Sequence, residues 1–214
     1  MQRFMNRKTA GKRLAAQLRR YVQSDVAVLA LPRGGVVVGA EVAKLLHAPL
    51  GIILVRKIGH PANTEYAIGA VAENEAPVYD QREVAAVDQT WLKLEEEAAE
   101  EMIEERHEQY YDHVFVQPNI EGRDVVIVDD GVATGLTMRA AIEWARSHGV
   151  RRIIAAAPVV AKDVITMLRE LADEVEVLIE PADFLGAVGA HYKNFDQVDD
   201  MEVRQLLLLR ASRA

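Results

Sequence analysis

Two adjacent carboxylates, Asp129 and Asp130, follow the strongest apolar run of the chain and precede a loop of small residues, 131–137. The loop reads Gly-Val-Ala-Thr-Gly-Leu-Thr, and the pattern after it predicts a helix. Its glycines permit close approach, its threonines supply hydroxyl groups, and the first N–H groups and the dipole of the helix favour an anion. The loop therefore suits a phosphate monoester. Because carboxylates repel phosphate, the two acids suit hydroxyl groups or a metal ion, and a sugar phosphate offers a diol together with a phosphate.

Two further loops carry cations and glycines at points where predicted strands end. One is residues 32–35, Pro-Arg-Gly-Gly, and the other follows Arg56 and Lys57 and runs over 58–66. In open α/β sheets, ligands bind beyond the carboxyl ends of the strands, so we expect all three loops at one edge of the sheet. The sequence contains no G-x-x-x-x-G-K-[S/T] motif and no G-x-G-x-x-G motif after a strand. We therefore expect neither a Walker-type nucleoside triphosphatase nor a Rossmann-type dinucleotide-binding site.

The elements that would position these loops alternate between strands and helices. Unbroken apolar runs predict strands covered on both faces, and apolar residues at helical spacing predict the helices. The predicted strands are 26–31, 51–57, 125–128, 152–159 and 175–179, and the predicted helices include 36–47, a helix from the end of the 131–137 loop to Gly149, and 163–172. This alternation predicts an α/β fold with a mainly parallel twisted sheet and helices on both faces.

We expect one domain over 1–214, with an excursion at 58–120 and a candidate C-terminal hood at 180–200. The excursion is too long for a simple crossover between strands, so it is expected to be functional or to form an interface. Within it, residues 66–90 fit either a hairpin or small edge strands.

Charge is unevenly distributed along the chain, which carries a net −8. Residues 1–20 hold seven Lys or Arg and no acid, and apolar residues at helical spacing behind them favour an amphipathic helix over a nucleic-acid arm. Residues 91–111 hold eight Glu against two cations and predict a long acidic helix that docks on the body or on a partner subunit. Its expected apolar stripe is Trp91, Leu94, Ala98 and Met102, with Leu92, Ala99 and Ile103 beside it. We therefore expect a homodimer rather than a monomer.

The composition excludes several classes of protein. Half of the residues are hydrophobic and 27% are charged, which excludes a disordered or fibrous chain. Cysteine is absent, which excludes disulfides, thiolate zinc sites and cysteine nucleophiles. The first residues have no apolar h-region, and no apolar run approaches the roughly 20 residues of a membrane span. We therefore expect a cytoplasmic protein with no membrane partner.

Residues 125–137, Val-Val-Ile-Val-Asp-Asp-Gly-Val-Ala-Thr-Gly-Leu-Thr, closely resemble the phosphoribosyl-pyrophosphate (PRPP) binding signature of type I phosphoribosyltransferases. Residues 31–35 resemble the pyrophosphate loop of that family, and residues 55–57 resemble the strand that leads into its flexible catalytic loop. The whole chain is also similar to a little-characterised bacterial branch of the family. That branch shares an opening motif, here Phe4, Asn6, Arg7, Ala10, Gly11 and Leu14, and an ending motif, here Pro181, Phe184, Val188, Gly189, Tyr192 and Phe195.

The resemblance implies a role for each matching residue. Asp129 and Asp130 would hold the 2- and 3-hydroxyls of ribose, and Arg33, Gly34 and Gly35 would bind pyrophosphate. Arg56 and Lys57 would add positive charge near the leaving group. The 5-phosphate would lie on Gly131, Val132, Ala133, Thr134, Gly135, Leu136 and Thr137. The predicted catalytic residues are Asp129, Asp130, Arg33 and Lys57.

The implied reaction transfers phosphoribosyl from PRPP to a small nitrogenous base and releases pyrophosphate, with Mg2+ carried by PRPP rather than by a protein metal site. The 6-oxopurine members of the family carry an acid where this chain has Ala133, so a different base is expected. Phe184, Tyr192 and Phe195 either stack on that base or belong to the core.

Two other functions stay open. One is a non-catalytic regulator that senses PRPP and binds nucleic acid. The basic segment 1–20 favours this function, whereas the acidic net charge of the chain argues against a nucleic-acid partner. A scaffolding protein would bind no PRPP at all.

Overall fold

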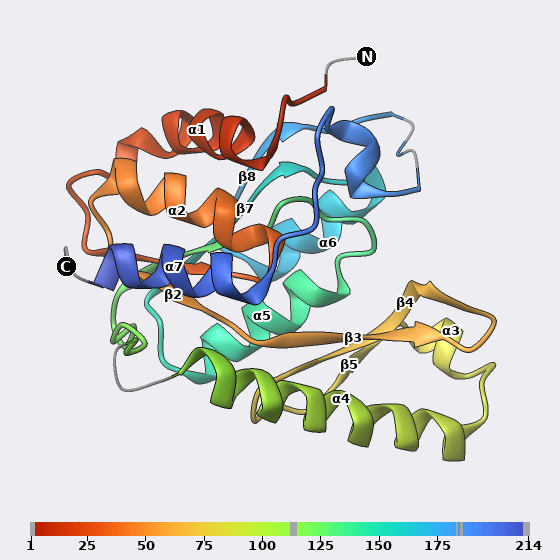
Figure 1. Cartoon of the computed structure of the whole chain (residues 1–214). Helices are drawn as coiled ribbons and strands as arrows, with labels where there is room; N and C mark the ends of the chain where they lie inside the picture. The colour runs from red at the N-terminus through yellow and green to blue at the C-terminus, as the bar shows by residue number, and fades with distance from the viewer. Residues whose placement is uncertain (1–2, 112–114, 183, 185, 212–214) are drawn as a thin grey trace.

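The computed structural model of the chain describes residues 3–111, 115–182, 184 and 186–211. The two ends of the predicted domain 1–214, residues 112–114 of the excursion, and residues 183 and 185 of the candidate hood lie outside the described residues. Five parallel strands form the main sheet in the order β2-β1-β6-β7-β8 (Figure 1). They are β1 (Val26–Ala30), β2 (Leu50–Ile52), β6 (Asp124–Val128), β7 (Arg152–Val159) and β8 (Glu174–Ile179). The predicted parallel α/β sheet is confirmed.

The central strands bury side chains on both faces. In β1, Val26, Val28 and Ala30 join one apolar core, whereas Ala27 and Leu29 join the core on the other face. The neighbouring strand β6 repeats this division, since its residues lie in register with those of β1. Burial of both faces explains why these runs are unbroken in the sequence rather than alternating with polar residues.

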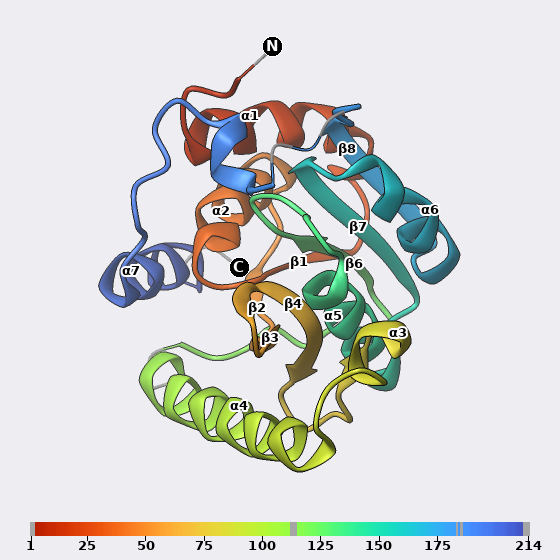
Figure 2. The ribbon, with the colours of Figure 1, turned by 90° about the vertical axis from the view of Figure 1, so that its right-hand side faces the viewer.

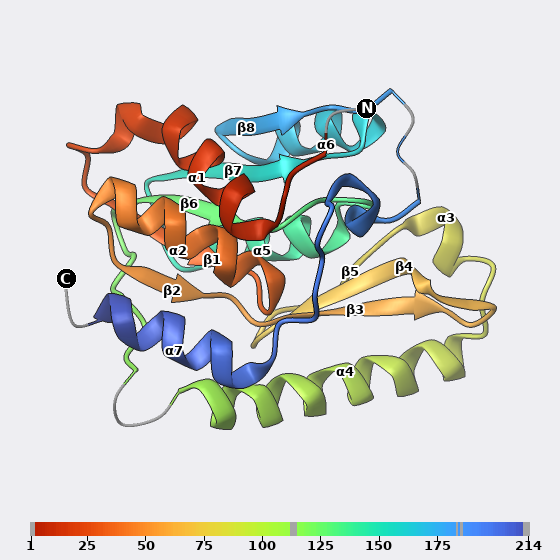
Figure 3. The ribbon, with the colours of Figure 1, turned by 45° about the horizontal axis from the view of Figure 1, so that its top comes forward.

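Helices cover the two faces of the main sheet (Figure 2). One face carries α1 (Arg7–Gln17), the short 3-10 helix η1 (Leu18–Tyr21) and α2 (Gly34–Leu46), and the other carries α5 (Leu136–Ser147) and α6 (Lys162–Leu171). The helix predicted over 36–47 is present as α2, which begins two residues earlier than predicted and ends one residue earlier. After the short helix η2 (Val188–His191), the C-terminal helix α7 (Asp200–Ala211) packs beside α2 and β2 (Figure 3). None of the helices in the described part of the chain is long and apolar enough to cross a bilayer.

A second sheet of three antiparallel strands follows β2. The prediction of one strand over 51–57 is wrong, because the chain leaves the main sheet after Ile52 and enters β3 (Val55–His60). β3 pairs with β4 (Asn63–Ala72), which pairs with β5 (Val78–Tyr79) and is followed by α3 (Gln81–Val84). The predicted loop 58–66 is consequently the tip of the β3–β4 hairpin, with its turn at residues 61–62. Of the two alternatives for 66–90, the hairpin is what the structure shows, because the second half of β4, the central strand of this sheet, pairs antiparallel with the short edge strand β5.

The acidic helix α4 (Gln89–Tyr110) packs on β3 and β4, so the second sheet lies between α4 and α5 (Figures 1 and 2). Its buried residues include Leu92, Ala99 and Ile103, which were expected beside the apolar stripe. Within the stripe itself, the Leu94 side chain is 59% exposed and Met102 is 37% exposed. The helix therefore docks on the body through a face rotated away from the expected one, and part of the expected stripe points to solvent.

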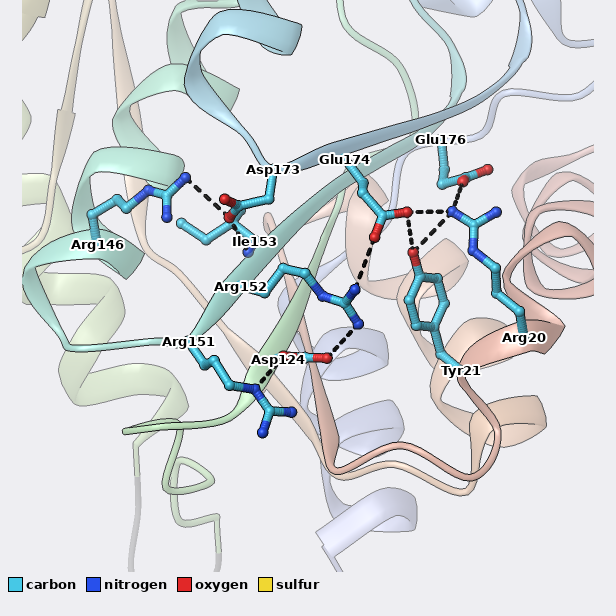
Figure 4. Close-up of polar contacts among 10 residues, drawn as sticks. All are labelled: Arg20, Tyr21, Asp124, Arg146, Arg151, Arg152, Ile153, Asp173, Glu174 and Glu176. Carbon is cyan, nitrogen blue, oxygen red and sulfur yellow. Dashed lines mark hydrogen bonds and ion pairs between the residues drawn. The ribbon is translucent and has the colours of Figure 1, made fainter.

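A network of ion pairs lies at the amino ends of β6, β7 and β8, at the edge opposite the 129–137 loop. The Asp124 carboxylate, only 3% exposed, accepts from Arg151 at 2.8 Å and from Arg152 at 2.6 Å. Arg152 also reaches Glu174, and Arg20 of η1 lies 2.5 Å from the same carboxylate. The network comprises Arg20, Tyr21, Asp124, Arg151, Arg152, Glu174 and Glu176 (Figure 4). Arg20, one of the cations of the basic segment 1–20, thus forms ion pairs within the fold.

Candidate functional site

The acid pair lies where β6 ends, with both residues only partly exposed. The backbone N–H of Asp130 donates to Asp129 Oδ1 at 2.7 Å, so one carboxylate closes the turn. Arg7, the first residue of α1, donates from Nε to Asp130 Oδ2 at 2.6 Å. The side chains of Arg7 and Asp130 are 12% and 13% exposed, so this ion pair is largely shielded from water.

Burial and mutual repulsion make it unfavourable to ionise both acids. Burial, and next the charge of Asp130, raises the pKa of Asp129 well above its usual range. Burial also raises the pKa of Asp130, but the charge and hydrogen bond of Arg7 act in the opposite sense. The pair therefore favours a state in which Asp130, beside Arg7, carries the negative charge and Asp129 holds a proton.

Arg7 also joins the acid pair to the C-terminal segment. Its guanidinium carbon lies 3.6 Å from the centre of the Phe195 ring, and its NH1 donates to the backbone carbonyl of Asp196 at 2.6 Å. The Tyr192 hydroxyl donates to the backbone carbonyl of Asp130 at 2.5 Å. The candidate hood 180–200 thus lies against the acid pair through two aromatic residues of the ending motif.

The loop 31–35 packs directly on the acid pair because two of its residues lack side chains. A Cβ at Gly34 would lie 2.0 Å from Asp130 Oδ2, and a Cβ at Gly35 would lie 3.2 Å from Asp129 Oδ1. The first of these distances is far inside any non-bonded contact, so a larger residue at position 34 would displace the carboxylate. The peptide bond between Pro32 and Arg33 is cis. The structure therefore brings Gly34, Gly35, Asp129 and Asp130 into one site.

Arg33 extends from this loop toward the C-terminal helix. Its NH1 lies 3.6 Å from Asp200 Oδ2 at the start of α7, and both side chains are 30% exposed. The Tyr110 hydroxyl at the end of α4 also donates to Asp200. At 3.6 Å and this exposure the Arg33–Asp200 pair is a weak one, so the guanidinium is able to exchange Asp200 for an anionic ligand.

The loop 131–137 is fixed at its start and offers donors at its end. The Val132 N–H already donates to Val159, and Ala161 donates back to Val132. Gly135 has φ +82° as the N-cap of α5, and a Cβ there would lie 2.4 Å from Met167. The first bond inside α5 runs from Arg139 to Gly135, so the N–H groups just before Arg139 have no partner within the helix. An anion would therefore bind at residues 133–137 rather than over the whole loop.

A cavity of about 480 Å3 lies beside this loop. Its wall includes Ala133 and Thr134 from the loop and Arg139 from α5. Tyr66 and Tyr79, from the second sheet, face them. The cavity therefore combines a cation and two aromatic rings with two carboxylates, Asp80 and Asp163, next to the predicted phosphate position.

Arg56 and Lys57 lie on β3, in the second sheet. Both line a cavity of about 260 Å3 between the hairpin and α4. Burial, and next the charge of Arg106, lowers the pKa of Arg56, whereas Glu95 acts in the opposite sense. The charged neighbours that act on Arg56 thus belong to α4.

No group of three or more His, Cys, Asp or Glu side chains placed to hold a metal ion occurs in the described ranges. The acids nearest the loop 131–137 in the described residues are the pair Asp129 and Asp130, of which Asp130 is engaged by Arg7, and Asp80 and Asp163, which line the cavity beside Ala133 and Thr134. This arrangement fits a divalent cation only if the ligand itself supplies most of the oxygens.

The sequence patterns do not single out Arg7 as a site residue. Its helical spacing predicts only a cation on a basic helix surface, although it stands in the opening motif. The opening motif was the signal from which a role for Arg7 could have been predicted. Arg7 belongs to that motif and Phe195 to the ending motif, and their side chains are in contact in the structure.

Comparisons with known proteins show what the chain as a whole is similar to. A family model, the phosphoribosyl transferase domain, matches residues 2–193. Two curated relatives, from two strains of Mycobacterium tuberculosis and provisionally named phosphoribosyl transferases, are 39% identical over 204 residues, which is 95% of this chain and 46% of each relative. The chain therefore spans about half the length of the curated relatives it matches. A crystal structure of a Thermus thermophilus protein is 41% identical, with a TM-score of 0.80 over 97% of this chain and 99% of that chain.

Proposed function

The chain belongs to the phosphoribosyl transferase family, and on that premise we propose that it transfers phosphoribosyl from PRPP to a nitrogenous base, releasing pyrophosphate. The observation that carries the proposal is the contact between two loops. Gly34 and Gly35 lie against Asp130 and Asp129, while the loop that carries the N–H groups of residues 133–137 follows the same acid pair in the chain and opens α5. A diol, a phosphate and a pyrophosphate attached to one sugar would each find a suitable group there.

In the proposed reaction, the bond between the anomeric carbon and pyrophosphate breaks through an oxocarbenium-like state, and the base nitrogen forms the new bond. Asp130 and Asp129 would hold the ribose hydroxyls, and residues 133–137 would hold the 5-phosphate. Arg33 would leave its weak pair with Asp200 to take the departing pyrophosphate in a bidentate contact. Catalysis would then consist of positioning the base in line and stabilising the leaving group.

Mg2+ would neutralise the phosphate oxygens of PRPP when bound, and we propose that it arrives with the substrate. The engagement of Asp130 by Arg7 supports this assignment, because it leaves few protein oxygens for a cation. We assign Lys57 and Arg56 to later contacts with the leaving group, which require the β3–β4 hairpin and α4 to open, since both now line the cavity beneath α4.

We propose that the acceptor is a base other than a 6-oxopurine, because position 133 is alanine.

We also propose that the protein acts in the cytoplasm as a homodimer. The exposed Leu94 and Met102 of α4 support a partner-facing surface. Light scattering of the purified chain would test the dimer, and a monomer at micromolar concentration would contradict it.

The deciding experiment measures pyrophosphate release from Mg2+–PRPP, with and without each of a panel of purine and pyrimidine bases, together with PRPP affinity by calorimetry. Asp130→Asn should lower PRPP affinity about tenfold to a hundredfold, because hydrogen bonds to charged groups are worth about 1.5–3 kcal/mol. Glu170→Gln, which removes one exposed charge from α6, is the matched control and should change nothing.

The outcomes separate the candidate functions. Base-dependent release supports the enzyme. Tight PRPP binding without release for any base would favour the regulator, for which Lys8, Lys12, Arg13 and Arg19 leave an exposed basic face on α1 and η1. Absence of PRPP binding would refute both.

A further inference from the structure

Arg7 contacts three parts of the proposed site at once. It donates to Asp130 at 2.6 Å, it lies under the Phe195 ring, and its Nε would be 2.7 Å from a Cβ at Gly34. Its side chain is 12% exposed, whereas Lys8, Lys12 and Arg13 on the same helix are exposed. The site therefore receives one cation that neither the phosphate loop nor the loop 31–35 supplies.

The guanidinium is held in place independently of the acid. The Phe195 ring lies 3.6 Å from its carbon, and the backbone carbonyl of Asp196 accepts from NH1 at 2.6 Å. Asn6, the residue before it, caps α1 by accepting from the Thr9 N–H, which fixes where the helix begins. Nε is consequently presented to Asp130 by contacts on other segments, as a preorganised donor rather than a mobile surface charge.

Because Arg7 donates to Oδ2, a ligand hydroxyl would have to reach the other carboxylate oxygen of Asp130, Oδ1. Rotation of the carboxylate is restricted by Arg7 on one side and by the close approach of Gly34 on the other. We propose that Arg7 is a positioning residue of the ribose site, which holds Asp130 in one orientation and in its ionised form so that the free oxygen accepts a sugar hydroxyl. This inference rests on the proposed function.

The charged and titratable groups that face Asp130 are few among the described residues. Asp129 precedes it, Arg7 pairs with it from α1, and the Tyr192 hydroxyl donates to its backbone carbonyl from the hood. Burial raises the pKa of Asp130, whereas Arg7, by its charge and hydrogen bond, and Asp129, by a side-chain hydrogen bond, lower it. Tyr192 stays a neutral phenol, because burial raises its pKa. Removing Arg7 should therefore raise the pKa of Asp130, and ribose binding should then require a higher pH.

The test compares Arg7→Met, Arg7→Lys and the control Lys12→Met by titrating ribose 5-phosphate into each protein between pH 5 and pH 9. At pH 7, Arg7→Met should bind about tenfold to a hundredfold more weakly and should recover affinity as the pH rises. Arg7→Lys keeps the charge but loses the fork that spans Asp130 and Asp196, so its affinity should fall while its pH profile stays that of the wild type. Lys12→Met should match the wild type throughout.

A carbon-13 NMR titration of the aspartate carboxyls in the ligand-free proteins completes the test. The Asp130 signal, assigned through Asp130→Asn, should titrate at higher pH in Arg7→Met than in Arg7→Lys. An unchanged Asp130 titration, or equal losses of ribose 5-phosphate and pyrophosphate affinity at every pH with a lowered melting temperature, would overturn the inference. Because the titration needs no ligand, it is readable even if the wild-type protein binds no ribose 5-phosphate, an outcome that would instead refute the proposed function.

Discussion

Replacing Asp124 by asparagine should destabilise the fold without changing ligand binding. The Asp124 carboxylate is 3% exposed and accepts two charge-assisted hydrogen bonds, from Arg151 and Arg152 (Figure 4). Each such bond is worth about 1.5–3 kcal/mol when shielded, but the arginines are 59% and 39% exposed, which reduces the value. The amide still accepts one bond. We therefore expect a loss of about 2 kcal/mol at pH 7, or roughly 4–8 °C in melting temperature for a chain of this size.

The sign of the pH dependence follows from the pKa of Asp124. Burial alone would raise this pKa, but the hydrogen bonds and charges of the two arginines lower it below its usual range. The stabilisation is therefore present above the pKa that Asp124 has in the unfolded chain, near 4, and is lost as the pH falls through the folded-state value. Urea unfolding followed by circular dichroism should show a large difference between wild type and Asp124→Asn at pH 7 and a small one at pH 3.

The control for this prediction is Asp163→Asn, an exposed position in the first turn of α6, which should change stability by less than about 0.5 kcal/mol. PRPP affinity should be equal in wild type and Asp124→Asn, because Asp124 begins β6 and the acid pair follows its end. A difference that persists undiminished at pH 3 would show that packing rather than charge stabilises this edge. Weakened PRPP binding would show that the two ends of β6 are coupled.

Three further predictions concern the site. Asp129→Asn should leave stability unchanged near pH 3, where the carboxyl is protonated in both states, and raise it at pH 8 in urea titrations. Burial and the Asp130 charge raise the pKa of Asp129, so the stability of the wild type falls as the pH rises above the unfolded-state pKa near 4; a lower stability of the variant at pH 8 would contradict this. Gly34→Ala should reduce ribose 5-phosphate affinity at least about tenfold in calorimetry, because its Cβ would overlap the Asp130 carboxylate, and unchanged affinity would mean that this contact is absent in solution. Arg33→Ala should weaken pyrophosphate about tenfold and ribose 5-phosphate little, and equal losses would place Arg33 outside the pyrophosphate site.

The strands of the main sheet were predictable because both of their faces are buried. The predicted strand 152–159 coincides with β7, and 26–31 exceeds β1 by one residue. The same signal failed at 51–57 for a physical reason. Ile53 and Leu54 are as buried as the residues of β2 before them, so hydrophobicity alone does not reveal that the chain changes sheets there.

The acidic helix shows a second limit of pattern analysis. Its length and type were predictable from composition and spacing, but two adjacent apolar stripes were present, and only packing against β3 and β4 decides which one is buried. α7 was missed although a signal existed: Val203 and Leu207 are buried one turn apart, and Asp199 accepts from the Glu202 N–H at the start of the helix.

Within the candidate site, local motifs identified the acid pair and the glycines that pack on it. They did not identify Arg7 as a member, because its partners lie 123 and 189 residues away in sequence. When the partners of a side chain are so far away in sequence, the residues around it predict only the local structure, here a basic helix, and not the contact. The contact between the two ends of the chain had to be seen in three dimensions.

That contact also bears on how the protein is made. Arg7 leaves the ribosome 189 residues before the carbonyl of Asp196 that accepts its hydrogen bond, which is about 10–40 s earlier at ordinary rates of synthesis. During that interval the glycine loop and the acid pair can already exist on a folded sheet, but Arg7 lacks the Phe195 ring and the carbonyl that hold it. The proposed ribose site should therefore be complete in a nascent chain only once the segment around Phe195 and Asp196 has been translated, however early the sheet itself folds.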